Sequence, residues 1–260
     1  MLRVENLKKV YGKFLALKGI SFVVRRGEIL GLIGENGAGK STTIRILVGL
    51  ISPTSGLVEY DGVNFFLRKD EIKRRIGYVP ETDSLYEDMT AEEYLRFFAS
   101  LYNVDYDSEW LKRLNIPNKT IAEMSKGMRR KLSIARSLIH DPDYLIYDEP
   151  FSGLDPTTSI TLADFLKRLK GKAILFSAHN LYYVEYLCDK VAIMKSGEIV
   201  YYGDVEEIKG LKTYIIRTED KVIRTNDVDE LVEILRSENV VSLDVEVKRL
   251  EDLYFELMRR

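Results

Sequence analysis

The stretch Gly34-Glu35-Asn36-Gly37-Ala38-Gly39-Lys40-Ser41 fits the pattern G-x-x-x-x-G-K-[ST], whose backbone N–H groups wrap the phosphates of a nucleotide. Residues 29–33 before it are an apolar run that predicts a buried strand, and residues 42–48 after it predict a helix. A strand, a glycine loop and a helix in this order aim the helix N-terminus at an anion. Lys40 is expected to reach the β- and γ-phosphates, and the Ser41 hydroxyl to bind Mg²⁺. The stretch therefore predicts a nucleoside triphosphate site; a glycine-rich turn without a ligand is the weaker interpretation.

The composition is typical of a globular protein with one large domain, or one large and one small domain. The 260 residues are 45% hydrophobic, which is enough for a substantial core. The net charge of −2 argues against a dedicated nucleic-acid binder, because such proteins carry a basic excess. No apolar run approaches the ~18 residues of a membrane span, and the N-terminus lacks the apolar region of a signal peptide. We expect a cytoplasmic protein whose contact with a membrane depends on another chain.

The first 81 residues predict short strands around the glycine loop. Residues 2–7 and 15–24 are strand-like, and Tyr11 and Gly12 lie in the connection between them. Residues 56–62 alternate in polarity and end in Asp-Gly, which is a hairpin signal. Residues 76–81 form a further short strand that a proline and Glu81 terminate. We therefore expect antiparallel strands near the N-terminus.

Residues 82–140 carry helical signals and no convincing strand. Thr90 and Glu93 form a capping box, and aromatic residues follow at helical spacing. The core resumes with an apolar strand at 144–147, a helix at about 158–169, and a strand at 173–177. This alternation predicts a mostly parallel α/β sheet into which residues 82–140 are inserted as a helical subdomain.

The last fifty residues show a different pattern. Residues 213–217 and 221–224 predict a hairpin, and a helix, an alternating strand and an amphipathic helix follow. No catalytic constellation is evident in this part of the chain. We therefore expect the α/β domain with the glycine loop to span residues 1–210, and a small α+β appendage to span residues 211–260.

Three polar residues follow core strands of the α/β domain. Asp148 and Glu149 end one apolar strand and His179 follows the next, where open α/β sheets bind their ligands. Hydrolysis of a phosphoanhydride needs a phosphate cradle, a metal ion and a group that orients water. Asp148 can hold Mg²⁺ through water, and Glu149 can polarise the attacking water beside the γ-phosphate. Because Asp-Glu pairs are common on surfaces, the informative features are the apolar run before this pair and Pro150 after it.

Over about residues 1–205 the chain resembles the ATP-binding subunit of ABC transporters. Tyr11 matches the aromatic residue that stacks on adenine, residues 34–41 the Walker A motif, and residues 144–149 the Walker B motif with its catalytic glutamate. Residues 152–155 match the D-loop, and His179 matches the switch histidine. The resemblance implies a P-loop NTPase core that hydrolyses ATP with Mg²⁺.

The site residues that the resemblance implies fall into three groups. The catalytic residues are Lys40, Glu149 and His179, and the metal-binding residues are Ser41, Asp148 and Glu81. The residues that contact ATP are Tyr11, Gly34, Glu35, Asn36, Gly37, Ala38, Gly39, Lys40, Ser41, Thr42, Glu81, Ser125, Lys126, Gly127 and Asp155.

Two motifs depart from the pattern of the family. The signature, usually L-S-G-G-Q, reads Met124-Ser125-Lys126-Gly127-Met128. Ser125 can cap the helix expected near Met128, whose end meets the γ-phosphate of the opposite subunit in this family, so catalysis needs a dimer. Lys126 adds positive charge, and Met128 removes a polar side chain. Glu81 stands where glutamine is usual, and its carboxylate could approach Mg²⁺ or water but would repel the γ-phosphate.

These departures resemble the branch of the family that serves exporters with ABC-2 membrane subunits. The resemblance implies a motor subunit that dimerises around two ATP molecules and drives transport through separate polytopic membrane subunits. It would lie at the inner face of the cell membrane through that partner, and we expect no nucleic acid. The segment after Glu81, through the helical insertion, is the expected docking surface.

Two other functions are compatible with parts of the pattern. A soluble ABC-type ATPase that acts on ribosomes or nucleic acid usually carries two cassettes, whereas this chain has one Walker A and one Walker B motif. A regulatory module with little hydrolysis is disfavoured because Glu149 and His179 are both present.

Overall fold

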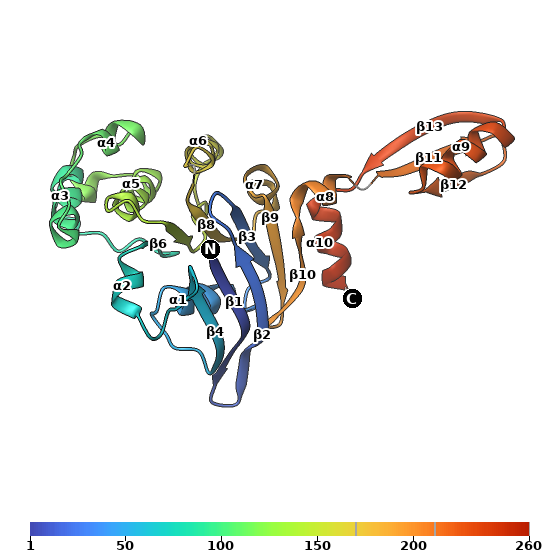
Figure 1. Ribbon diagram of the computed structural model, residues 1–260. Helices are drawn as coiled ribbons and strands as arrows, with labels where there is room; N and C mark the ends of the chain where they lie inside the picture. The colour runs from blue at the N-terminus through green and yellow to red at the C-terminus, as the bar shows by residue number, and fades with distance from the viewer. Residues whose placement is uncertain (170, 211, 260) are drawn as a thin grey trace. The chain divides into compact units, whose positions relative to one another are not determined.

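The computed structural model describes residues 1–169, 171–210 and 212–259. Its contacts divide the chain into two compact units, Met1–Tyr202 and Gly203–Arg260 (Figure 1). The first unit contains two sheets, and the second contains a smaller sheet of its own. The functional domain limits at 1–210 and 211–260 remain our proposal.

The central element of the first unit is a six-stranded sheet in the order β10-β9-β3-β8-β7-β6. Strand β3 pairs in parallel with β8 and β9, and β7 pairs in parallel with β6 and β8. Every residue of β3, β7 and β8 is buried, which explains their continuous apolar sequences. The mostly parallel sheet predicted from the sequence is confirmed. The strands are β3 (Ile29–Gly34), β6 (Ile76–Val79), β7 (Tyr144–Tyr147), β8 (Ala173–Ala178), β9 (Lys190–Lys195) and β10 (Glu198–Asp204).

A four-stranded antiparallel sheet, ordered β2-β1-β4-β5, supplies the second layer. The strands are β1 (Leu2–Tyr11), β2 (Phe14–Val24), β4 (Ser55–Tyr60) and β5 (Val63–Asn64). The Asp-Gly signal is confirmed, because Asp61 and Gly62 turn between β4 and β5 with φ of 51° and 79°. Strand β1 is longer than expected: Tyr11 pairs with Phe14 and therefore ends a strand instead of lying in a loop.

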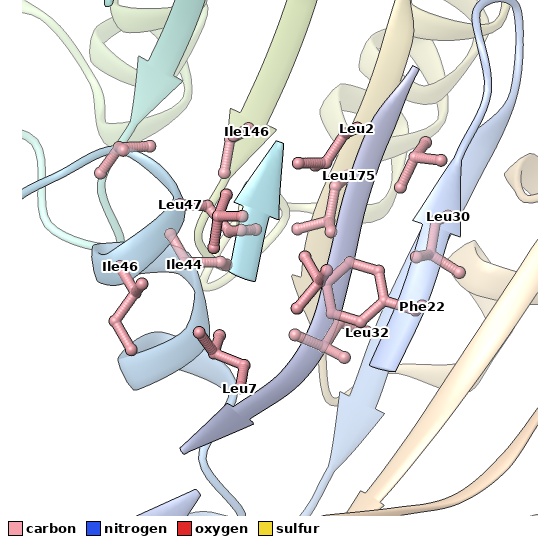
Figure 2. Packing of buried hydrophobic residues seen from close by; sticks show 14 of the residues in the cluster. Leu2, Leu7, Phe22, Leu30, Leu32, Ile44, Ile46, Leu47, Ile146 and Leu175 are labelled. Atoms are coloured by element: carbon pink, nitrogen blue, oxygen red, sulfur yellow. The ribbon is translucent and has the colours of Figure 1, made fainter. Parts of the chain in front are cut away.

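The hydrophobic core lies between these two sheets, around helix α1 (Lys40–Leu47). Figure 2 shows Ile44 and Leu47 of α1 packed near Leu7 and Ile146, which come from β1 and β7. On the other face of the six-stranded sheet, Gly31 lies under α7 (Leu181–Leu187), where a Cβ atom would come within 2.7 Å of Val184. Helix α1 is thus held rigidly at the carboxyl end of β3.

The regular elements within residues 82–140 are helices, as predicted, with irregular segments between them and an isolated bridge between Thr90 and Thr120. The capping box is present: the Glu93 N–H donates to Thr90 Oγ1 at 3.3 Å, and the Thr90 N–H donates to Glu93 Oε2 at 2.8 Å. The helices around and within this insertion are α2 (Lys69–Lys73), α3 (Ala91–Tyr102), α4 (Glu109–Arg113), the short 3₁₀ helix η1 (Ile121–Glu123) and α5 (Lys126–Leu138).

Helix α6 (Pro156–Lys167) begins slightly earlier than expected, because Asp155 caps it and Pro156 suits its first turn. Within the described residues, no helix has the length and apolar character needed to cross a membrane.

The second unit has the α+β character predicted for the end of the chain. Strand β11 pairs in antiparallel fashion with β12 and with β13, and α9 packs on β12. Ile216 and Leu231 are buried within it. Its elements are α8 (Val205–Gly210), β11 (Lys212–Thr218), β12 (Val222–Thr225), α9 (Val228–Ser237), β13 (Val240–Val247) and α10 (Leu250–Arg259).

Candidate functional site

The glycine loop connects the end of β3 to the start of α1. Gly39 is the N-cap residue of α1, has φ of 108°, and provides no side-chain cap. A Cβ atom at Gly39 would lie 2.7 Å from Leu17 Cδ2, so both the backbone conformation and the space require glycine. The first turn of α1 contains no acidic residue. The N–H groups of this helix end are therefore available to an anion.

Lys40, the first residue of α1, is almost completely buried, with 6% of its surface exposed. Its Nζ donates to the Gly34 carbonyl at 2.7 Å and to the Glu35 carbonyl at 3.2 Å, and lies 4.0 Å from Glu149 Oε1. Burial lowers the pKa of Lys40, and Glu149, Asp148 and Glu81 oppose that shift. The cation is thus held against the loop among three carboxylates.

Two oxygen ligands suited to Mg²⁺ lie next to Lys40. Ser41 Oγ donates to Asp148 Oδ1 at 3.3 Å, and Ser177 Oγ donates to the same oxygen at 2.6 Å. The described residues contain no group of three or more His, Cys, Asp or Glu side chains that could hold a metal. Mg²⁺ is commonly held by one or two protein oxygens, with water and phosphate completing its shell. Ser41 and Asp148 fit an ion that is shared with a bound nucleotide.

Glu149 is held in an unusual conformation beside this pair. Its φ is 48°, the left-handed region that non-glycine residues rarely adopt, and such outliers cluster at functional sites. Its N–H donates to Ser177 Oγ at 2.8 Å, and His179 Nδ1 lies 2.8 Å from its Oε2. Burial raises the pKa of Glu149, although the charges of His179 and Lys40 oppose the shift. A carboxylate with a raised pKa is suited to accept a proton.

Ser177 is a site residue that the sequence argument did not identify. It is fully buried, and its hydroxyl links Asp148 to the backbone of Glu149. The available signal was a hydroxyl residue at the end of the apolar strand β8, next to the strand that carries the two acids.

A cleft of about 240 Å³ lies in front of the loop. Tyr11 and Phe14 form one side of it from the ends of β1 and β2, and both rings are exposed. Exposed rings at the edge of a nucleotide cleft can pack on a base. Phe14, like Ser177, was not among the predicted residues. The lining residues are Tyr11, Phe14, Ala16, Glu35, Asn36, Gly37, Gly39, Lys40, Ser41, Thr42, Glu81 and Glu149.

Eight predicted site residues do not line this cleft: Gly34, Ala38, Ser125, Lys126, Gly127, Asp148, Asp155 and His179. Ser125 caps α5 by accepting the Met128 N–H at 3.3 Å, so α5 begins at Lys126 and not near Met128 as expected. This early start follows from the cap itself, because the capped N–H belongs to the third residue of the helix. Asp155 accepts the Thr158 N–H at 2.9 Å and caps α6.

The signature residues lie near the D-loop of the same chain. A Cβ atom at Gly153 would collide with Lys126 Nζ, and Gly127 faces Thr158 of α6. His179 lines a neighbouring cavity with Ser152 and Gly153. One chain therefore brings together the loop, Glu81, Asp148 and Glu149, and leaves the signature outside the cleft.

Comparison with known proteins identifies the family. The family model described as ABC transporter matches residues 17–152. An uncharacterized ABC transporter ATP-binding protein of Methanocaldococcus jannaschii is 40% identical to the chain and covers 98% of it and 98% of its own length. The chain belongs to the ABC transporter ATP-binding proteins. Family membership makes it an ATPase that uses ATP and Mg²⁺, as the sequence predicted.

Two further ABC proteins add detail. Nod factor export ATP-binding protein I of Ralstonia nicotianae is 36% identical, over 80% of this chain and 68% of its own length. A solved dimeric ATP-binding cassette, in a post-hydrolysis state with ADP and Pi, superimposes with a TM-score of 0.71 at 25% identity. That match covers 78% of this chain and 98% of the solved one. The likeness confirms the P-loop NTPase architecture.

Proposed function

We propose that this ABC ATPase is the motor subunit of an exporter. Its membrane subunits are separate polytopic chains of the ABC-2 type. The observation that carries the proposal is the connected group of Lys40, Ser41, Asp148 and Glu149 at the N-terminus of α1. Similarity to a Nod factor export protein supports the direction of transport. The site residues have the roles described next.

Lys40 releases the loop carbonyls and pairs with the β- and γ-phosphate oxygens, because these carry more negative charge than the carbonyls. Ser41 and Asp148 hold the position of Mg²⁺, which neutralises phosphate charge when it is bound. Ser177 fixes the position of the Asp148 carboxylate relative to the Glu149 backbone, because its hydroxyl donates to Asp148 and accepts the Glu149 N–H.

Glu149 orients the attacking water and accepts its proton. Its Oε2 lies 2.8 Å from His179 Nδ1, so His179 holds the carboxylate while Oε1 faces Lys40. Because burial raises the pKa of Glu149, the carboxylate is a stronger base than an exposed glutamate. Tyr11, with Phe14, packs against the base of ATP.

A second copy of the chain supplies the other half of each site. The N-terminal turn of α5 contains no acidic residue and carries Lys126, so it favours an anion. In this arrangement Ser125, Lys126 and Gly127 of one copy meet the γ-phosphate on the loop of the other, and Asp155 lies at the same interface. Two ATP molecules are then enclosed between two copies.

The membrane subunits contact the helical insertion. Tyr86 and the exposed residues Phe97 and Leu101 of α3 form an apolar surface, with the Tyr86 and Phe97 rings 5.7 Å apart. A short segment of the chain connects Tyr86 of this surface to Glu81, which lines the nucleotide cleft, so a partner bound there can act on the cleft through that segment. The protein is thereby held at the inner face of the cell membrane.

The test is the variant Glu149→Gln. We expect it to bind ATP with the affinity of the unchanged chain, to lose turnover, and to form an ATP-dependent dimer, because the amide keeps the shape but accepts no proton. Turnover is measured by phosphate release and the dimer by sedimentation with Mg²⁺ and ATP. Glu206→Gln, at an exposed side chain of the second unit, is the matched control. Turnover in Glu149→Gln equal to that of the control would contradict the role of Glu149.

The alternative, an ATPase that acts on ribosomes without a membrane partner, is tested by affinity purification from cells. We expect a polytopic membrane protein to co-purify. Recovery of ribosomes with no membrane protein would contradict the transporter function.

A further inference from the structure

Helix α5 presents a row of polar side chains to the end of β6 and to the segment that follows it. Arg130, Ser133 and Arg136 are spaced three residues apart, so they lie along one face of the helix. Arg136 Nη2 donates to the Tyr78 carbonyl at 3.3 Å, and Ser133 Oγ donates to Asp83 Oδ1 at 2.6 Å. These contacts join the helix to residues 78–83 at several points.

Arg130 makes the most extensive of these contacts. Its side chain is 1% exposed, and Nη1 donates to the Pro80 carbonyl at 2.7 Å and lies 3.2 Å from Asp83 Oδ1. Its Nη2 donates to the Glu81 carbonyl. One guanidinium therefore binds three of four consecutive residues. A planar fork with fixed donors can satisfy acceptors in this arrangement, whereas a lysine ammonium cannot reproduce it.

The buried charge of Arg130 is compensated chiefly by Asp83 and Glu81 of this segment, with a smaller contribution from Asp148. Burial lowers the pKa of Arg130, and Asp83 and then Glu81 oppose the shift. Because a buried cation without its partners is strongly unfavourable, the guanidinium and residues 80–83 are constrained to keep their relative positions.

This connection joins two parts of the proposed dimeric site. One is the nucleotide cleft of the chain, and the other is the end of α5 that meets a second copy. The Glu81 side chain lines the nucleotide cleft and contributes to the electrostatic environment of Lys40. Helix α5 begins beside Ser125, the residue proposed to meet the nucleotide of a second copy. Arg130 does not line the cleft in front of the loop.

We propose that Arg130 is a positioning residue that fixes Glu81 relative to the N-terminal end of α5. Nucleotide on the glycine loop then sets, through Glu81, the position at which Ser125 meets the second copy. This inference rests on the proposed function. It requires that loss of the Arg130 contacts weakens ATP-driven dimer formation and leaves nucleotide binding by one chain unchanged.

The test uses the full chain with Glu149→Gln, so that ATP is retained. Arg130→Lys is expected to bind Mg²⁺-ADP, the nucleotide used to measure binding by one chain, within about twofold of the parent. It is expected to raise the dissociation constant of the ATP-bound dimer at least tenfold, because several charge-assisted hydrogen bonds are lost. Binding is measured by calorimetry and dimer formation by sedimentation. Lys131→Met removes a positive charge at the next position of α5 and should match the parent in both measurements.

A double-mutant cycle separates positioning from simple loss of stability. Arg130→Lys is expected to weaken the dimer less than twofold further when Glu81→Ala is already present, because both changes then break the same connection. Asp83→Asn, which removes the partner charge at nearly constant volume, should reproduce the effect of Arg130→Lys, and it replaces that variant if Arg130→Lys does not fold.

Three results would overturn the inference. The first is additive effects of the two changes in the cycle. The second is dimer formation by Arg130→Lys, and by Asp83→Asn, as tight as that of Lys131→Met. The third is a loss of nucleotide binding that equals the loss of dimer formation. If the Glu149→Gln parent itself does not dimerise with ATP, the proposed function fails and the inference fails with it.

Discussion

The N-termini of α1 and α5 are both proposed to bind phosphate, but the chain builds them differently. Helix α1 begins after Gly39, which leaves its N–H groups without a side-chain cap, and buried Lys40 is its first residue. Helix α5 begins after Ser125, whose hydroxyl already accepts the Met128 N–H. The end of α1 is therefore a site prepared within one chain, whereas the end of α5 is stable alone and becomes a site only against a second copy.

The N-termini of α1 and α5 also differ in the part of the structure that supports them. Helix α1 follows β3, a fully buried strand in the middle of the parallel sheet. Helix α5 lies in the helical insertion and is joined to the sheet through residues 78–83. The sheet itself thus positions the end of α1, whereas the position of α5 also depends on side-chain contacts with residues 78–83.

The strongest test of the site at the N-terminus of α1 is the variant Lys40→Met. We expect the affinity for Mg²⁺-ATP to fall about 10- to 100-fold, because hydrogen bonds to charged groups contribute roughly 1.5–3 kcal/mol, and we expect hydrolysis to be lost. Titration with a fluorescent nucleotide measures the affinity. Lys209→Met, at a helix of the second unit, is the control. Unchanged affinity in Lys40→Met would mean that the loop does not hold the phosphates through this residue.

The corresponding change at the N-terminus of α5 is Ser125→Ala. We expect ADP binding by one chain to stay within twofold, because Ser125 does not line the cleft, while turnover falls about tenfold. Loss of the cap should also lower the stability of the protein by about 1 kcal/mol. Phosphate release and chemical denaturation measure the two effects. A drop in ADP affinity as large as that of Lys40→Met would remove the distinction between the two helix ends.

The two halves also differ in how well the sequence predicts them. The loop, Asp148 and Glu149 are recognisable because each depends on a local pattern: a glycine spacing, or acids directly after an apolar strand. The fold class follows from the same alternation of strands and helices. The pairing of Tyr11 with Phe14 depends on the register of β1 and β2, which a short turn determines only in the folded sheet.

Ser177 and Arg130 were not predicted because their partners are distant in the sequence. Ser177 reaches Asp148 only because β8 lies beside β7 in the sheet. Arg130 contacts Pro80 and Asp83 only because α5 packs on β6. In a single sequence these residues are a hydroxyl in a strand and a cation in a basic cluster. Their partners follow only from the order of the strands and from the packing of α5 on the sheet.

The smallest expected effect concerns Glu149, the buried acid beside Lys40. Burial raises the pKa of Glu149 above its ordinary value, so the native state binds this proton more tightly than the unfolded chain does. The contribution of Glu149 to stability is therefore greatest in acid and is lost as the pH rises through its raised pKa. In Glu149→Gln without nucleotide, we expect a higher melting temperature than in the unchanged chain at neutral pH. The gain should be about 2–4 °C for each kcal/mol and should vanish at acidic pH. Scanning calorimetry across this range, with Glu206→Gln as the exposed control, measures it. A gain that is equal at all pH values would show that packing, and not the buried charge, separates the two side chains.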